Sequence, residues 1–272
     1  MKKSKGSQII FAILGFFLAA VILSPLIYCL STSFMTEQEI YASKLVPSRI
    51  GLDNYRSALR VAPIFRFILN STIVACTCTF MQLLTGALAG YAFGSLKFRG
   101  RKVLFYLILA TMMIPGNAII IANYLTMAKL QALDSYRALI LPYMTSAFCI
   151  FNMRQAFLSL PSDLQEAATI DGCNSLQFFV RVGLPLTLPS LGALGIYTFL
   201  QIWNQYLWPL LVTNTINLRT VQIGIGMLQN ADSVAYGPIM AGTTMVLIPS
   251  ILVFVLGQKS LISGLTAGAV KG

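Results

Sequence analysis

The chain has 272 residues, of which 57% are hydrophobic and only 10% are charged. A soluble domain carries about 25% charged residues, so this composition excludes an ordinary soluble protein and indicates one that crosses a membrane several times. The net charge of +11 does not indicate a nucleic-acid partner, because the basic residues are scattered at the ends of apolar runs. The sequence contains no histidine, which excludes a catalytic or metal site built on that residue.

The first apolar run covers residues 9–30 and follows Lys2, Lys3 and Lys5. A cleaved signal peptide would also begin with basic residues, but its apolar core is only about 7–15 residues long. The run is longer than that and is long enough to cross a bilayer, so we expect a retained first transmembrane helix. A mixed polar loop, residues 31–65, follows it.

Later apolar runs predict five more transmembrane helices, over residues 67–93, 103–122, 138–153, 186–212 and 238–256. The first of these contains Gly86, Gly90 and Gly94 at four-residue spacing, which predicts a face for close helix packing. Pro115 predicts a kink in the next run. Residues 203–209 interrupt the run that contains them.

A short basic loop fixes the predicted topology. It carries Lys97, Arg99, Arg101 and Lys102 and no acidic residue. Short loops rich in lysine and arginine stay in the cytoplasm. With six spans, both termini and residues 154–190 are then predicted to be cytoplasmic.

The predicted organisation has two parts. Residues 1–66 form the first helix and an outer loop, and residues 67–272 form a five-helix core. The core includes the loop of residues 154–190 and ends in a short cytoplasmic tail, residues 257–272.

Several kinds of site are missing from the sequence. Cys76 and Cys78 are two positions apart and point to different sides of a helix, which disfavours a metal pair. No G-x-x-x-x-G-K-[ST] phosphate loop is present. The predicted spans contain no charged residue, whereas ion-coupled carriers usually need an ionisable group at depth. A transporter built on these spans would therefore take its energy from a separate subunit.

Residues 154–190 form the longest segment between apolar runs that is dense in helix signals and carries acids. Ser162 and Gln165 have the spacing of an N-terminal capping box. Asp163 and Glu166 are expected in the first turn of this helix, where carboxylates favour the positive end of the dipole. Gly172 is expected to end this helix as a C-terminal cap.

A second short helix is predicted to follow directly. Asn174 and Gln177 have the spacing of a cap at its start, and Gly183 with Pro185 is expected to end it. Two short capped helices at a bend make a compact knob, and small alanine side chains on it allow another surface to approach closely. This chemistry is typical of a docking element.

The knob resembles the EAA loop of permease subunits of binding-protein-dependent ABC importers. The resemblance is carried by Glu166, Ala167, Ala168, Asp171, Gly172, Leu184 and Pro185. The last residues, 264–272, are similar to the tail of the second permease subunit of carbohydrate importers such as the maltose and glycerol-3-phosphate systems. The likeness extends over residues 65–272.

This resemblance implies an all-α membrane protein with six transmembrane helices, the type I importer permease fold, and a cytoplasmic EAA coupling loop. It implies a bacterial cytoplasmic membrane, a second homologous permease subunit, two ATP-binding subunits and an extracytoplasmic solute-binding protein. ATP and Mg²⁺ would bind the ATPase partner, and this chain would hold no cofactor and catalyse no reaction. In this scheme Glu166 pairs with a charge on the ATPase, both alanines form contact surface and Gly172 forms the turn.

Amide and aromatic side chains suit a neutral sugar, because amides pair with hydroxyls and rings stack on C–H faces. The candidates for a substrate pathway are Asn117, Asn123, Tyr124, Asn152, Gln201, Asn204, Gln205 and Tyr206. Alternatively, these amides bond between helices, and Trp203, Tyr206 and Trp208 form an interfacial aromatic belt. The outer loop of residues 213–237 resembles the segment that meets the binding protein, with Leu218, Arg219, Thr220 and Gly224 as candidates; a solvated connector is the alternative.

Three other functions remain open at this stage. Within the importer class, the cargo is either a sugar or a phosphorylated polyol such as glycerol-3-phosphate, and the uncharged spans favour the neutral cargo. A stand-alone membrane channel would need no ATPase and would leave the knob unexplained. A membrane enzyme is disfavoured by the missing histidines and buried acids.

Overall fold

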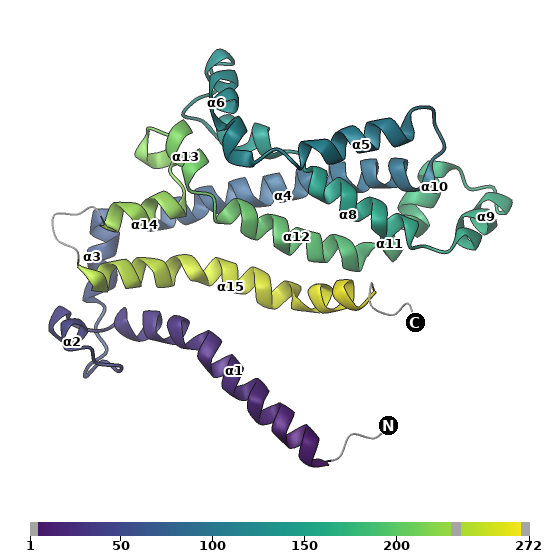
Figure 1. Cartoon of the computed structure of the whole chain (residues 1–272). Coiled ribbons are helices and arrows are strands. Elements are labelled where there is room, and N and C mark those ends of the chain that lie inside the picture. The colour runs from purple at the N-terminus through teal and green to yellow at the C-terminus, as the bar shows by residue number, and fades with distance from the viewer. Residues whose placement is uncertain (1–4, 230–234, 268–272) are drawn as a thin grey trace. The chain divides into compact units, whose positions relative to one another are not determined.

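The computed structural model describes residues 5–229 and 235–267, and in these ranges all regular secondary structure is helical (Figure 1). The longer helices are α1 (Lys5–Thr32), α4 (Ile64–Ser95), α5 (Arg101–Thr111), α6 (Ile120–Lys129), α8 (Ala147–Leu158), α12 (Leu188–Trp203) and α15 (Tyr236–Ala267). The shorter ones are α2 (Glu37–Tyr41), α3 (Asp53–Val61), α7 (Tyr136–Ile140), α9 (Ser162–Ile170), α10 (Ser175–Phe178), α11 (Leu184–Leu186), α13 (Leu207–Val212) and α14 (Val221–Gln229). Single turns complete the set: η1 (Gly116–Ile119), η2 (Leu141–Tyr143) and η4 (Ile216–Leu218) are 3₁₀, and η3 (Phe179–Gly183) is a π-helix.

Three stretches of the described chain are single helices long and apolar enough to cross a membrane. They are Phe11–Thr32, Ile64–Ser95 and Tyr236–Lys259. Two bent helix pairs also qualify, which makes up to five spans if each pair counts as one. The helical, membrane-spanning fold class is thus confirmed, whereas the predicted number of six spans is not reached by this measure.

The predicted kink in the third span is a sharp bend. Helix α5 ends at Thr111, and the chain resumes at Gly116 after Pro115, at an angle of 89° between the two halves. Pro115 lacks the N–H group that would continue the helix and has an extended ψ of 131°. The third run is therefore two helices at right angles, where the sequence indicated one kinked span.

The fourth predicted span, residues 138–153, is not one helix, and this expectation needs correction. The chain leaves helical structure between η2 and α8, because Pro142 cannot donate a backbone bond and Ser146 begins a new helix. The side chain of Ser146 accepts a hydrogen bond from Cys149 N, as an N-cap does. Helix α8 alone is about 18 Å long, too short to cross a bilayer.

The remaining spans differ from prediction mainly at their ends. The run that begins near residue 186 is interrupted as predicted, since α12 ends at Trp203 and α13 begins at Leu207. Helix α15 begins close to the predicted position but continues to Ala267, into the residues expected to form a tail. The final part of that predicted tail, residues 268–272, lies outside the described residues.

The chain divides into two compact units. One contains Met1–Phe65 with Gly224–Ile248, and the other contains Arg66–Ile223 with Pro249–Gly272. In the first unit, every described side chain of α1 from Phe11 to Tyr28 is exposed. A helix as apolar as α1 needs lipid or another protein around such a surface.

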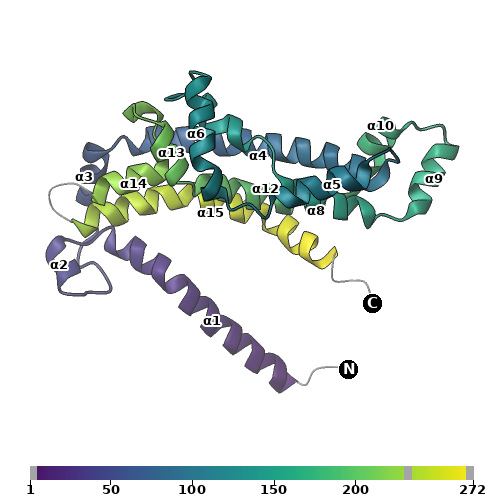
Figure 2. The ribbon, with the colours of Figure 1, turned by 45° about the horizontal axis from the view of Figure 1, so that its top comes forward.

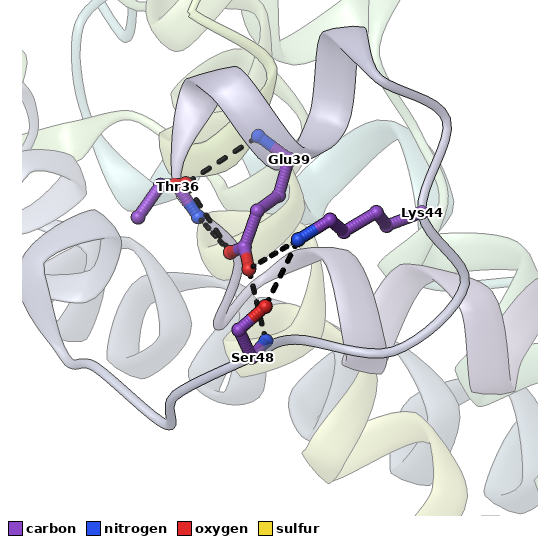
Figure 3. A network of polar contacts seen from close by, with 4 residues as sticks. All are labelled: Thr36, Glu39, Lys44 and Ser48. Atoms are coloured by element: carbon purple, nitrogen blue, oxygen red, sulfur yellow. Dashed lines mark hydrogen bonds and ion pairs between the residues drawn. The ribbon is translucent and has the colours of Figure 1, made fainter.

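A polar clip organises the loop after α1 in the first unit (Figure 3). The Glu39 carboxylate accepts hydrogen bonds from Thr36 N at 3.0 Å, Thr36 Oγ1 at 3.2 Å and Ser48 N at 2.9 Å. Lys44 Nζ lies 3.5 Å from the same carboxylate. Hydrogen bonds from the Ser48 side chain, then from the backbone N–H groups of Thr36 and Ser48, lower the pKa of Glu39 from 4.5 to about 2.

We expect the free energy of unfolding to depend on pH through the Glu39 carboxylate of this clip. Because the pKa of Glu39 is lower in the folded state, its contribution to stability is complete above pH 4.5 and is lost as the pH falls towards 2. The unfolding midpoint of Glu39→Gln should therefore lie below that of wild type at neutral pH, and the difference should narrow steadily below pH 4.5. Thermal unfolding of both proteins in detergent, from neutral pH to below pH 4.5, measures this difference in midpoint. Glu37→Gln, exposed on the same short helix, is the control, and a difference independent of pH would contradict the assignment.

The second unit is built on close contact between α4 and α8. A Cβ placed on Gly86 would lie 2.9 Å from Cys149 Cβ, and one on Gly90 would lie 2.6 Å from Met153 Cβ. For Gly94 the nearest atom is Phe157 Cβ at 3.2 Å. The predicted small-residue packing face is thus confirmed, and α8 is its partner.

Figures 1 and 2 show α4, α8 and α12 running side by side within this unit. In both views α9 and α10 lie at one end of these helices and α13 lies at the other end. The knob and the point where the chain leaves α13 for the predicted outer loop are therefore at opposite ends of these helices.

Candidate functional site

The first helix of the knob, α9, begins one residue earlier than a serine cap requires. Pro161 occupies the N-cap position, and Ser162 is the first helical residue. The Ser162 hydroxyl donates to Asp163 Oδ1 at 3.2 Å and caps no backbone N–H, so the predicted capping box with Gln165 is wrong. The predicted end is confirmed: Gly172 follows the C-cap with φ of +80°, the left-handed region that glycine enters without strain.

The cap of the second helix, α10, forms as predicted. Asn174 N donates to Gln177 Oε1 and Gln177 N donates to Asn174 Oδ1, each at 2.8 Å. The helix does not end at Gly183 and Pro185, however. It continues through the π-turn η3 and α11, and the chain bends by 72° only at Thr187. The Thr187 hydroxyl donates back to Gly183 O at 2.9 Å, which satisfies a carbonyl at the bend.

An aromatic cluster anchors the knob to the long helices. Tyr91 of α4 has its ring 5.4 Å from Phe157, 6.3 Å from Phe178 and 5.1 Å from Phe179. Each of these four rings is buried. The Tyr91 hydroxyl donates to Ser175 O at 2.9 Å, so α4 also holds the start of α10 by a hydrogen bond.

Arg154 fixes the start of the segment. Its Nε donates to Phe93 O at 3.1 Å, and its guanidinium carbon lies 4.2 Å from the centre of the Phe105 ring. The arginine thus satisfies a carbonyl near the end of α4 and stacks its charge on an aromatic face. Both contacts hold α8 against its neighbours just before the chain enters the knob.

The residues of the predicted coupling motif separate into an exposed and an anchored set. Glu166 and Ala167 are exposed, whereas Ala168 is only 8% exposed and packs into the aromatic cluster. The sequence analysis expected both alanines to form contact surface. Ala168 does not, because its side of α9 faces the aromatic cluster. Of the other motif residues, Asp171, Gly172 and Pro185 are exposed, and Leu184 packs beside the cluster.

A hollow of about 630 Å³ lies beside the exposed face of α9. Residues at the end of α4 form one part of its lining and residues of α9 the other: Ser95, Lys97, Ser162, Gln165, Glu166, Thr169 and Ile170. It contains one basic and one acidic side chain, Lys97 and Glu166. Ile170, at the edge of the hollow, is 86% exposed, so its side chain could make an apolar contact with a partner.

The substrate-pathway candidates do not converge on one pocket among the described residues. Asn117 is exposed in η1, and Asn123 and Tyr124 are half-buried in α6. Asn152 Nδ2 donates to Phe148 O of its own helix at 2.8 Å, and Asn204 Oδ1 accepts from Gln222 Nε2 at 3.3 Å. Of the remaining candidates, Gln201 and Tyr206 are exposed and Gln205 is half-buried. Bonds to protein groups favour a structural role for Asn152 and Asn204.

The two tryptophans proposed for an aromatic belt lie inside the unit. Trp203 and Trp208 are each 2% exposed. Trp208 Nε1 donates to Ala138 O at 3.0 Å, which satisfies its one polar atom. Only Tyr206, at 47% exposure, remains placed for a membrane interface.

The outer-loop candidates lie near a polar network that the sequence analysis missed. Leu218 and Arg219 are half-buried, Thr220 is 5% exposed, and Gly224 is buried in the other unit. The network centres on Asn70, a fully buried amide near the start of α4. Its only sequence signal was an asparagine inside an apolar run, and its partners lie far along the chain.

Several apolar helices long enough to cross a bilayer, together with the exposed knob between α8 and α12, define a multi-pass membrane protein. Within that class the chain belongs to the family of binding-protein-dependent transport system inner membrane components, whose family model matches residues 82–265.

Curated relatives agree over nearly the whole chain. The arabinooligosaccharides transport system permease protein AraQ of Halalkalibacterium halodurans is 34% identical and the match covers 99% of this chain and 100% of that protein. The sn-glycerol-3-phosphate transport system permease protein UgpE of Escherichia coli is also 34% identical, over 90% of this chain and 91% of that protein. Among solved structures, a bacterial ABC transporter involved in the import of the acidic polysaccharide alginate matches with a TM-score of 0.82 and 25% identity, covering 95% of this chain and 99% of the matched chain.

Proposed function

We propose that the chain is the second permease subunit of an ATP-driven importer, which moves a sugar or oligosaccharide from an extracytoplasmic solute-binding protein into the cytoplasm by alternating access. The family and the name of the AraQ relative support this class of function. One structural observation carries it furthest: Glu166 and Ala167 are exposed on a short helix whose opposite face is locked into an aromatic cluster. An exposed but rigid knob is what transmission of force from a separate ATPase requires.

Each motif residue takes a distinct role in this coupling. Glu166 offers a charge to a basic group of the ATPase, and Ala167 allows close approach. Ala168 anchors the helix, and Gly172 allows the turn into α10. Two ATP-binding subunits supply ATP and Mg²⁺ chemistry, and a second permease subunit completes the pathway across the membrane.

The orientation follows from the basic loop that precedes α5. Lys97 lines the same hollow as Glu166, so the basic loop and the knob lie on one side of the protein. That side is the cytoplasm in our proposal, because short basic loops are retained there. Six crossings would then place both termini inside. Because α8 is too short to cross alone, the fourth crossing in this proposal is broken and consists of α7, η2 and α8 together. The segment around η4 lies on the outer side and contacts the solute-binding protein.

A neutral cargo is favoured over an anionic one. The predicted spans contain no basic side chain that would stabilise a buried anion. The names of the relatives include both an oligosaccharide and a phosphorylated polyol, so import of glycerol-3-phosphate is the alternative. The exposed amides and Tyr206 remain candidates for contact with sugar hydroxyls and rings.

Co-purification from native membranes tests the proposal. We expect tagged wild-type chain to recover an ATPase and a second permease, and Glu166→Arg to lose the ATPase while it retains the second permease. Charge reversal places like charges together at the docking surface and removes a favourable pair. Glu37→Arg, the same change on an exposed helix outside the knob, should recover both partners.

Each other outcome has a definite meaning. Recovery of the ATPase by Glu166→Arg would keep the importer and remove Glu166 from the coupling site. Recovery of the wild-type chain alone under gentle extraction would overturn the importer in favour of a stand-alone channel.

A further inference from the structure

The polar network around Asn70 fastens the chain between Thr213 and Val221 to α4. Asn70 is 0% exposed, and its Nδ2 donates to Asn217 O and to Arg219 O, each at 2.8 Å. Its Oδ1 accepts from the Tyr136 hydroxyl at 2.7 Å. Both N–H groups of the amide are therefore used on one short stretch of backbone, and the oxygen fixes the amide's orientation.

Neighbouring groups hold the two ends of the same stretch. The Ser71 hydroxyl accepts from Val221 N at 3.0 Å. Asp134 accepts from the backbone N–H groups of Asn214 and Thr215, each at 2.9 Å, and from the Thr215 hydroxyl. These hydrogen bonds from Thr215 and Asn214 hold the pKa of Asp134 below its ordinary value, so the carboxylate is charged at neutral pH.

An amide buried in an apolar helix is costly unless all its polar atoms are bonded. A leucine of similar size would fill the space around position 70 without that cost. The amide therefore has a purpose that apolar packing cannot serve, which is to bind two backbone carbonyls of another segment. The backbone is fixed in this way while the side chains of Asn214, Thr215, Ile216 and Asn217 stay exposed.

We propose that Asn70 is a positioning residue that presents the exposed surface of residues 214–217 in one fixed conformation for docking of the solute-binding protein. This rests on the proposed function and adds the cause of the surface's rigidity. A surface ordered in advance loses less conformational entropy on binding, so the affinity of docking rises without a new contact. The amide itself touches no partner, because it is fully buried.

Spin-label mobility tests the positioning role in the purified chain. A nitroxide on Ile216→Cys, in a background with Cys76→Ser and Cys173→Ser, reports motion of the outer surface. We expect slow motion with Asn70 present and clearly faster motion in Asn70→Ala. Thr72→Val is the matched control, because the Thr72 hydroxyl donates to Ile68 O of its own helix. A label on Ile170→Cys, in the knob, should be unaffected by either change, which excludes general unfolding; an unchanged signal at position 216 would overturn the proposal.

The reconstituted transporter tests the docking role. With the purified solute-binding protein of the same transporter, we expect Asn70→Ala to raise the concentration for half-maximal ATPase stimulation about tenfold, with basal and maximal rates retained. Thr72→Val should leave it unchanged. If mobility at position 216 rises but that concentration does not, the docking role is overturned while the importer stands. Failure of the importer itself would appear separately, as the absence of any ATPase partner.

Discussion

Gly90→Ala is expected to destabilise the protein, although it adds only one methyl group. The new Cβ would lie 2.6 Å from Met153 Cβ, 2.8 Å from Arg154 N and 2.9 Å from Met153 C. Two of these atoms belong to backbone, so no side-chain rotation relieves the clash. Overpacking of this kind costs about 1–3 kcal/mol and separates α4 from α8. Alanine also favours the helix by roughly 1 kcal/mol relative to glycine, and the cost of the clash must exceed this gain for the protein to lose stability.

The control for this prediction is Gly15→Ala in α1. A Cβ on Gly15 meets no heavy atom within 4 Å, so only the gain in helix propensity remains. Equilibrium unfolding in detergent should show a loss of stability for Gly90→Ala and none for Gly15→Ala. Equal stability of the two variants would mean that α4 and α8 are not in close contact.

Phe157→Ala should both destabilise the protein and release the knob. Phe157 is 3% exposed, packs against Tyr91 and Phe179, and lies within reach of Gly183. Removal of a buried phenylalanine costs about 3–5 kcal/mol, because a cavity replaces its contacts. Its contacts join α8 to Tyr91 of α4 and to Phe179 and Gly183 of η3, so local opening of the knob at η3 should precede general unfolding.

Trypsin detects that opening at Arg181, which is exposed in η3. We expect cleavage after Arg181 to be much faster in Phe157→Ala than in wild type under native conditions. Leu158→Ala, at a neighbouring position that is 47% exposed, should be cleaved at the wild-type rate. If both variants lose the same stability and open equally, the aromatic cluster is not what anchors the knob.

The predicted capping boxes of α9 and α10 show what local sequence spacing can and cannot predict about the start of a helix. Asn174 and Gln177 have the same spacing as Ser162 and Gln165, yet only the first pair forms a capping box. The difference is Pro161, whose φ of −58° and ψ of 134° already provide the N-cap geometry and shift the serine into the helix. A spacing rule identifies the residues but cannot say which of two adjacent positions the helix will use as its cap.

Contacts between distant segments were out of reach for a different reason. The spacing of Gly86, Gly90 and Gly94 predicted a packing face, but nothing local named α8 as its partner. Asn70 was one amide in an apolar run, and its bonds join it to carbonyls far along the chain. The predicted fourth span failed similarly, because hydropathy counts apolar residues and does not register that Pro142 interrupts the helix.

Helix α4 has a thermodynamic consequence for the transporter. It is unbroken from Ile64 to Ser95. It bonds Asn217 and Arg219, on the side that we propose is outside, through Asn70, and it bonds the knob through Tyr91. These two attachments are about six helical turns, or roughly 30 Å, apart on one rod without a joint. If docking outside shifts this rod and thereby strengthens ATPase binding inside by some factor, reciprocity requires ATPase binding to strengthen docking by the same factor. The ATPase would thus set the affinity of a surface on the far side of the membrane that it never touches.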